Sequence, residues 1–153
     1  MVIFRSSHAV YDCRYHLVWS TKYRKKIFEH EHEREECKKL LKRAAEEYGM
    51  KILTIEVDED HLHLYIEVPP QMSIGNGVGI LKSISARKVF QRFPYFKKKP
   101  WAGHLWESSY FVRSVGEGVT AEMVKLYIEN HGDQVLWPAQ GKLFPKGTMK
   151  PKR

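Results

Sequence analysis

The stretch from Asp58 to Val68 constrains the fold of this chain more than any other. From His61 onward it alternates strictly between polar and apolar residues, which is typical of a strand with one buried face. The apolar side consists of Leu62, Leu64, Ile66 and Val68, and the polar side of His61, His63, Tyr65 and Glu67. Two histidines at this spacing lie roughly 7 Å apart along a strand that rises ~3.3 Å per residue, so both rings can reach one metal ion above the sheet. The alternative is two unrelated polar side chains on a solvated face.

Composition narrows the class of protein. The chain has 153 residues, enough for one domain with a buried core. Its 26 lysines and arginines exceed its 18 carboxylates, and a net charge of +8 favours a polyanionic partner, with nucleic acid ahead of membrane. No apolar run approaches the ~18 residues of a membrane span. The absence of a secretory signal at the N-terminus and of a CxxC pair between Cys13 and Cys37 predicts a cytoplasmic protein with reduced thiols.

The periodicity of apolar residues predicts the other elements. Strands are expected over 14–20, 51–57 and 105–115, and helices over 30–48, 72–93 and 119–131.

Turn and loop residues predict how these elements are connected and where the domain ends. A tight turn at 58–60 predicts an antiparallel hairpin between the histidine strand and strand 51–57, whose core side would be Leu53, Ile55 and Val57. Residues 1–12 are expected to be a polar lead-in and 94–100 a basic loop. We expect one domain over 1–131, followed by a mobile basic tail over 132–153.

Two further basic segments are candidate nucleic-acid contacts. Residues 21–26 carry four cations around Tyr23, so this turn is either a solvated hairpin tip or a phosphate-contacting loop whose tyrosine stacks on a base. The second interpretation selects Lys22, Tyr23 and Arg24. On helix 72–93, the candidates Lys82, Arg87 and Lys88 are either phosphate contacts or ordinary surface charge.

The glycines at 75, 77 and 79 form no nucleotide-binding fingerprint, because neither the Walker lysine nor the Rossmann spacing follows. They allow close approach of a nucleic-acid backbone or simply a loose helix start.

Helix 119–131 carries a second set of reactive side chains. Tyr127 and His131 are four residues apart and lie one turn from each other on the same face. Gly116 and Gly118 form a flexible joint between this helix and the sheet, which would let the helix carry both side chains over the paired histidines.

With these blocks in place, the chain resembles the single-tyrosine transposases of small bacterial and archaeal insertion sequences, within the superfamily named for its His-hydrophobic-His (HUH) motif. The resemblance spans about residues 11–131. It rests on the order and spacing of five blocks, Tyr15–Trp19 with Lys22–Lys25, Asp60–Leu64 with Val68–Pro70, Leu81–Arg87, Trp106–Val112 and Tyr127–His131.

The resemblance implies a compact α+β, ferredoxin-like fold with a central antiparallel sheet, two packed helices and a C-terminal catalytic helix. It implies a homodimer in which one subunit supplies its tyrosine in trans to the histidines of the other. The substrate would be single-stranded DNA with hairpins at the element ends. His61 and His63 would bind a divalent metal ion, and Tyr127 would attack the scissile phosphate to form a 5′-phosphotyrosine link.

One position departs from the pattern of this family. His131 occupies the place of a glutamine that commonly provides the third metal ligand. Three histidines shift the preference from Mg²⁺ or Mn²⁺ toward Zn²⁺. His131 is therefore a third ligand, a general base beside Tyr127, or a helix-terminal cation.

Three other functions compete with this one. A host-domesticated relative would act at chromosomal palindromes, and a replication or conjugation nuclease of the same superfamily fits the short chain less well. A non-catalytic module would stack single-stranded RNA or DNA on strand aromatics such as Tyr15, Trp19 and Tyr65, and it would need neither the histidine pair nor Tyr127.

Overall fold

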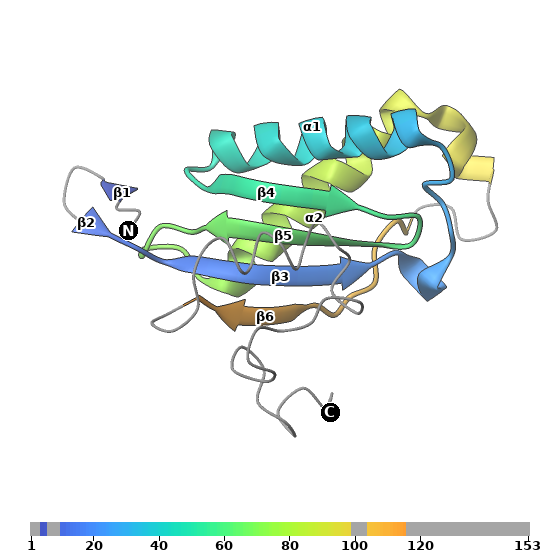
Figure 1. The fold of residues 1–153 in the computed structure, drawn as a ribbon. Helices are drawn as coiled ribbons and strands as arrows, with labels where there is room; N and C mark the ends of the chain where they lie inside the picture. Colours follow the sequence, from blue (N-terminus) through green and yellow to red (C-terminus); the bar gives the residue numbers. More distant parts are fainter. Residues whose placement is uncertain (1–3, 6–9, 99–103, 116–153) are drawn as a thin grey trace, which may run out of the picture.

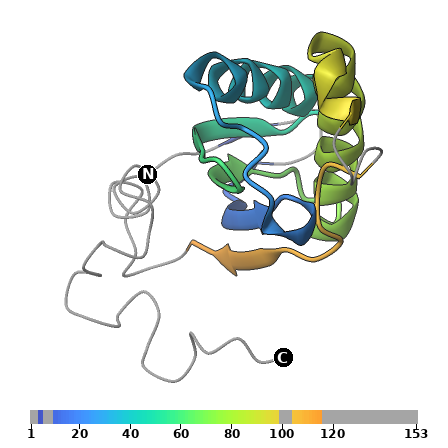
Figure 2. The same ribbon diagram turned by 90° about the vertical axis from the view of Figure 1, so that its right-hand side faces the viewer.

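The computed structural model describes residues 4–5, 10–98 and 104–115. Four of its strands form one antiparallel sheet in the order β4-β5-β3-β6. These strands are β3 (Arg14–Ser20), β4 (Lys51–Val57), β5 (His61–Glu67) and β6 (Phe111–Ser114). Both long helices, α1 (Glu31–Glu47) and α2 (Ile74–Arg92), lie on the same side of this sheet (Figures 1 and 2). The expected α+β fold with a central antiparallel sheet and two packed helices is confirmed.

The core lies between the sheet and the helices. Leu62, Leu64 and Ile66 are fully buried, as the alternation of the histidine strand predicts. They meet residues of β3 and of both helices, including Leu17, Trp19, Leu41 and Leu81. Because the apolar side of β5 faces the helices, its histidine side faces the opposite surface of the sheet.

The β4–β5 hairpin is confirmed, with one correction inside β4. The amide N–H of Asp58 donates to the carbonyl of His61 at 2.7 Å and closes the turn. The register shifts between Ile52 and Thr54, so Leu53 is the extra residue of a bulge. Ile52, rather than the expected Leu53, therefore lies in the core at 9% exposure.

The helix ends agree with the sequence signals to within two residues. At the start of α1, the N–H of His30 donates to the Glu33 carboxylate at 3.0 Å in a capping box. Helix α2 starts after Ser73, whose hydroxyl accepts from the N–H of Asn76 at 3.0 Å. A Cβ at Gly77 would lie 3.2 Å from the sulfur of Met50, so this glycine allows close packing of α2 on the segment that leads into β4. The predicted approach of a nucleic-acid backbone to these glycines stays a prediction.

Three expectations, two about loops and one about a strand, were wrong. The lead-in contains a short strand pair, β1 (Phe4–Arg5) with β2 (Val10–Tyr11), and the basic loop after α2 contains the helix η2 (Pro94–Lys98). The strand expected over 105–115 is shortened to β6. The segment before β6 does not continue this strand. Its residues Leu105 and Trp106 are buried, and Trp106 forms an isolated bridge with Thr21.

Several predicted segments lie outside the described residues. They are the joint at 116–118, the catalytic helix over 119–131 and the tail over 132–153. The domain boundary at residue 131 therefore stays a prediction. Within the described part of the chain, no helix is both long and apolar enough to cross a membrane.

Candidate active site

The polar side of β5 brings two histidines together on the sheet surface opposite the helices. The ring centroids of His61 and His63 lie 5.0 Å apart, with their planes at 76°. His63 is only 5% exposed, and Tyr65 and Glu67 farther along the strand are also buried. This surface is therefore not the solvated face that the alternative interpretation required.

A third histidine joins this pair from the neighbouring strand. His16 of β3 lies diagonally across from His63, and the two rings stack with centroids 5.8 Å apart and planes at 8°. Burial, and secondarily the charge of Arg113, lower the pKa of His16 to about 4, so its imidazole is neutral at physiological pH. The sequence signal was present, because alternation along 14–20 places His16 opposite Leu17 and Trp19. What the sequence did not reveal was the pairing of β3 with β5.

The carboxylate of Asp60 contacts both His61 and Arg24. Its Oδ1 lies 2.8 Å from His61 Nδ1, and its Oδ2 lies 3.3 Å from Arg24 Nη2. Burial alone would raise the pKa of Asp60, but the His61 hydrogen bond and the Arg24 charge outweigh it and hold that pKa below its usual range. The other nitrogen of His61, Nε2, is 3.9 Å from Asp58 Oδ2, which is longer than a hydrogen bond.

The histidine pair has the chemistry of a partial metal site. Neutral imidazoles are good ligands for divalent ions, and the two rings are close enough to converge on one ion. Within the described ranges, no group of three or more His, Cys, Asp or Glu side chains is arranged to hold a metal. A site built on His61 and His63 would take its remaining ligands from residues beyond these ranges, from a substrate or from water.

The basic segment 21–26 lies next to this site and is called the basic loop from here on. It holds an unusual backbone conformation. Within the short helix η1 (Lys22–Arg24), Tyr23 and Arg24 have φ values of 59° and 54°, which side-chain-bearing residues rarely adopt. The N–H of Tyr23 donates to a Glu107 carboxylate oxygen at 2.7 Å, and the N–H of Arg24 donates to the Thr21 carbonyl at 2.9 Å. These contacts hold the Tyr23 ring out at 64% exposure, with the Lys22 ammonium 5.1 Å from its centroid.

Comparison with known proteins gives the family of this chain. Residues 9–131 match the model of the family described as "Transposase IS200 like". The chain belongs to the IS200-like transposase family. This result confirms the resemblance to single-tyrosine transposases that the five sequence blocks carry.

Individual relatives cover most of this transposase. It is 38% identical to the ISDra2 transposase TnpA of Deinococcus radiodurans over 125 residues, which is 82% of this chain and 88% of the relative. It is 30% identical to the IS200 element transposase of Salmonella typhimurium over 142 residues, which is 90% of this chain and 93% of that protein.

Solved structures share the fold of the transposase. A Deinococcus radiodurans crystal structure assigned as a transposase superimposes with a TM-score of 0.66 at 38% identity, covering 83% of this chain and 96% of that chain. A REP-associated tyrosine transposase, solved in complex with a REP hairpin, superimposes with a TM-score of 0.52 at 8% identity, covering 84% of this chain and 69% of that chain. The second match shows a common fold only.

Lys82 of the transposase is engaged within the protein. Its ammonium donates to the carbonyls of Glu107 and Ser109 at 2.6 and 2.9 Å and lies 5.6 Å from the centroid of a Trp19 ring. Burial lowers the pKa of Lys82 below its usual range despite the opposing charge of Glu107. The side chain thus holds the segment before β6, and its predicted role as a phosphate contact remains a prediction.

Arg87 and Lys88 lie on the helix layer, on the other side of the sheet from the histidines. Both are exposed on α2. Lys88 lines a groove between α1 and α2 with Glu36, Lys39, Leu40, Arg43, Gln91 and Arg92. The structure therefore does not bring these two predicted DNA contacts together with His61 and the basic loop. Tyr127 and His131 lie outside the described residues.

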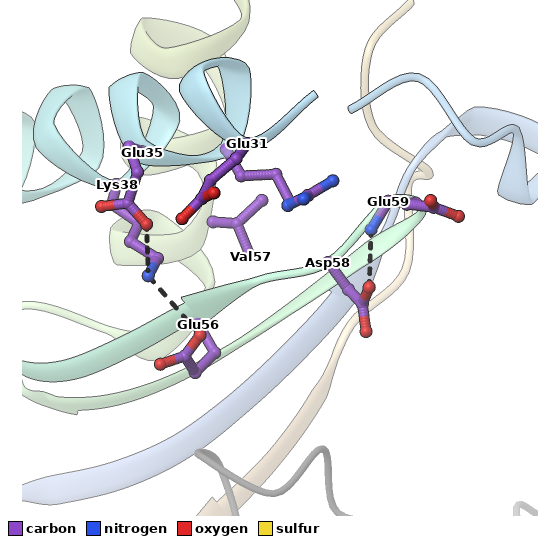
Figure 3. A pocket seen from close by; sticks show the side chains of 8 residues that line it. Glu31, Glu35, Lys38, Glu56, Val57, Asp58 and Glu59 are labelled. Atoms are coloured by element: carbon purple, nitrogen blue, oxygen red, sulfur yellow. Dashed lines mark hydrogen bonds and ion pairs between the residues drawn. The ribbon is translucent and has the colours of Figure 1, made fainter. Parts of the chain in front are cut away.

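A second hollow near the β4–β5 turn is an ion-pair network. Figure 3 shows Lys38 of α1 between carboxylates of Glu35 and Glu56, at 3.1 and 3.5 Å. Because this ammonium already neutralises part of the acidic lining, we assign the hollow a structural role in joining α1 to β4.

Proposed function

We propose that this transposase cleaves and rejoins single-stranded DNA at hairpin-bearing element ends through a 5′-phosphotyrosine intermediate at Tyr127. Family membership supports strand cleavage and transfer. The observation that carries the proposal is the pair of histidine rings 5.0 Å apart on one surface of the sheet. The choice of a hairpin as the substrate class follows from the resemblance to the single-tyrosine transposases.

The chemistry conserves the phosphodiester bond energy. The Tyr127 oxygen forms a bond to the scissile phosphorus, the bond from phosphorus to the 3′-oxygen breaks, and that oxygen leaves as a 3′-hydroxyl after taking up a proton. Attack by the 3′-hydroxyl of another strand reverses these steps and joins the two DNA segments. A phenol with a pKa of ~10 is a poor nucleophile, so Tyr127 needs a group that accepts its proton or a nearby positive charge that stabilises the phenolate.

His61 and His63 would hold the divalent ion of the reaction, with His131 as the third ligand or as the base that accepts the Tyr127 proton. When bound, the ion supplies positive charge that polarises the scissile phosphate. We expect Mg²⁺ or Mn²⁺ if His131 stays out of the site, and Zn²⁺ if all three imidazoles ligate. His16, stacked on His63, helps to keep that ring in a fixed plane.

DNA would reach the site over the basic loop. The loop borders the histidine pair, since Arg24 contacts Asp60 beside His61. In this proposal Lys22 and Arg24 contact phosphates, and the exposed Tyr23 ring stacks on a base. We further propose a homodimer that pairs the tyrosine of one subunit with the histidines of the other, acting on DNA in the cytoplasm.

A labelled single-stranded hairpin substrate tests this function directly. Incubated with Mg²⁺ or Mn²⁺ and resolved on a denaturing gel, the wild-type protein should form a covalent protein–DNA adduct that Tyr127→Phe abolishes. His61→Ala and His63→Ala should each reduce the adduct at least ~100-fold, by removing a metal ligand. His104→Ala, an exposed histidine of the described chain, serves as the matched control. Undiminished DNA binding with no adduct under any metal would instead support the non-catalytic module.

A further inference from the structure

The turn between β4 and β5 carries a carboxylate that contacts both the candidate metal ligand and the basic loop. We propose that Asp60 is a positioning residue, which fixes the His61 ring so that Nε2 is its ligating nitrogen and couples that ring to DNA through Arg24. This inference rests on the proposed function, in which His61 holds a metal and the basic loop contacts DNA.

The contact with His61 sets the tautomer of the ring. An ionised carboxylate only accepts hydrogen bonds, so the 2.8 Å contact to Asp60 Oδ1 requires Nδ1 of His61 to be the donor. In a neutral imidazole, the lone pair then lies on Nε2. Metal-binding histidines in proteins usually donate their second nitrogen to a carboxylate, a backbone carbonyl or water, and such a contact fixes the tautomer and the orientation of the ring.

The second oxygen of Asp60 extends the contact to the loop. Arg24 Nη2 lies 3.3 Å from Oδ2, while the Arg24 side chain remains 64% exposed. The backbone of Asp60 is tied to the same loop, because its carbonyl accepts from the Thr21 N–H at 2.9 Å and from the Thr21 hydroxyl at 3.2 Å. These backbone bonds keep the turn in place when the Asp60 side chain is changed.

The strained backbone of the loop aims Arg24 at this carboxylate. Left-handed conformations at Tyr23 and Arg24 are unfavourable for residues with a Cβ and persist only where surrounding contacts impose them. Here the Glu107 carboxylate holds the Tyr23 N–H. A DNA phosphate that binds the exposed guanidinium would draw it away from Asp60 and leave this carboxylate wholly to His61. DNA binding and metal binding should then strengthen each other.

The neighbouring residue of the turn provides a matched control. Glu59 carries the same charge and faces Lys26 across 3.9 Å in a more exposed ion pair. Figure 3 shows its carboxylate directed away from that of Asp58. Comparing Asp60→Ala with Glu59→Ala therefore separates the contact with His61 from the loss of one negative charge in this turn.

The first experiment measures metal affinity and tautomer in the full chain. Mn²⁺ titrations followed by electron paramagnetic resonance should show affinity about 10- to 100-fold weaker in Asp60→Ala and within about twofold of wild type in Glu59→Ala. Long-range ¹H–¹⁵N spectra of the metal-free protein should show His61 protonated on Nδ1 in wild type and Glu59→Ala, and a mixture of tautomers in Asp60→Ala. Asp60→Asn, which keeps an acceptor of the same shape, should hold the tautomer and lose part of the affinity.

The outcomes separate this inference from the proposed function. If Asp60→Ala keeps both the wild-type Mn²⁺ affinity and the wild-type His61 tautomer, the role of Asp60 is disproved, while the Tyr127 adduct can still form. If instead His61→Ala binds Mn²⁺ as wild type does, the metal assignment fails, and an unchanged tautomer in Asp60→Ala would still count against Asp60 independently.

The coupling to DNA has its own comparison. Adding a single-stranded hairpin oligonucleotide should tighten Mn²⁺ binding several-fold in the wild type and in Lys26→Ala. In Arg24→Ala the oligonucleotide should tighten Mn²⁺ binding clearly less than in Lys26→Ala, because only direct ligation of the ion by a DNA phosphate remains. Coupling as large in Arg24→Ala as in the wild type and in Lys26→Ala would disprove the link through this arginine.

Discussion

Tyr23 holds a backbone conformation that its own side chain disfavours. At φ 59° and ψ 18°, it lies in the left-handed region, where asparagine is better tolerated than tyrosine. Its ring is nevertheless presented to solvent beside Lys22 rather than packed. A strained residue that forms no part of the core is best explained by a demand at the surface, and a base to stack on is such a demand.

The substitution Tyr23→Asn separates stability from DNA binding. Asparagine should leave the free energy of unfolding unchanged or raise it by up to about 1 kcal/mol, because it fits the same backbone with less strain. Affinity for a single-stranded oligonucleotide should fall by about 1 to 3 kcal/mol, the contribution of one stacked base. Chemical denaturation and fluorescence anisotropy measure the two quantities. Equal DNA affinity in the variant would show that the ring does not stack.

Glu67 lies at the other end of the histidine strand, and its ionisation opposes folding. Burial raises the pKa of Glu67 to about 7, although its hydrogen bond with Tyr11 acts in the opposite direction. A carboxyl whose pKa is higher in the folded protein stabilises the fold while protonated. That contribution is complete below pH ~4.5 and is lost as the pH rises through about 7.

Glu67→Gln mimics the protonated carboxyl at every pH. The variant should therefore be more stable than the wild type at pH 8, by about 1 to 3 kcal/mol, and of similar stability at pH 4. Thermal unfolding at both pH values tests this difference. A Tm gain of equal size at pH 4 and pH 8 would contradict the titration of Glu67.

At the scale of elements, the sequence predicted those strands and helices that are determined by the burial of one face. The alternation from His61 to Val68 identified β5 and its core side, and the apolar stripe of 30–48 identified α1, because burial of one face determines both patterns. The bulge at Leu53 was not predictable, since it depends on how β4 fits its partner strand.

Long-range contacts set the remaining limit on sequence interpretation. The sequence offers Lys82 as a phosphate contact or as ordinary surface charge, and it does not reveal the two backbone carbonyls, 25 and 27 residues away, that accept its hydrogen bonds. His16 was overlooked for the same reason, because only the pairing of β3 with β5 places it against His63. In the candidate site, the shared face of His61 and His63 on β5 could thus be predicted. The side chains that contact them from other strands could not.

The glycines of α2 give a prediction at the same scale. A Cβ at Gly79 meets nothing within 4 Å, so Gly79→Ala should stabilise the protein by about 0.5 to 1 kcal/mol through helix propensity. At Gly77 the added Cβ would lie 3.2 Å from the Met50 sulfur, so Gly77→Ala should gain less or lose stability. Paired denaturation curves measure the difference. A larger gain at Gly77 would mean that Met50 moves aside without cost.

At the scale of the whole molecule, charge is distributed over both layers of the fold. The basic loop borders the histidine surface, whereas Arg87, Lys88 and the cations of α1 lie on the helix layer. One short strand of DNA cannot contact both layers of one subunit at once unless it passes around an edge of the sheet. A site completed by a second subunit would bring further charge to the histidine surface.

Subunit mixing tests whether that completion occurs. Tyr127→Phe and the double variant His61→Ala/His63→Ala should each be inactive alone. If the tyrosine acts in trans, a mixed dimer has one site with an intact histidine pair and an intact tyrosine, and random mixing restores roughly a quarter of the sites. If the tyrosine acts in cis, every site in the mixed dimer lacks one component and no adduct forms. The denaturing gel distinguishes these results, provided that the two variants are unfolded and refolded together so that their subunits exchange.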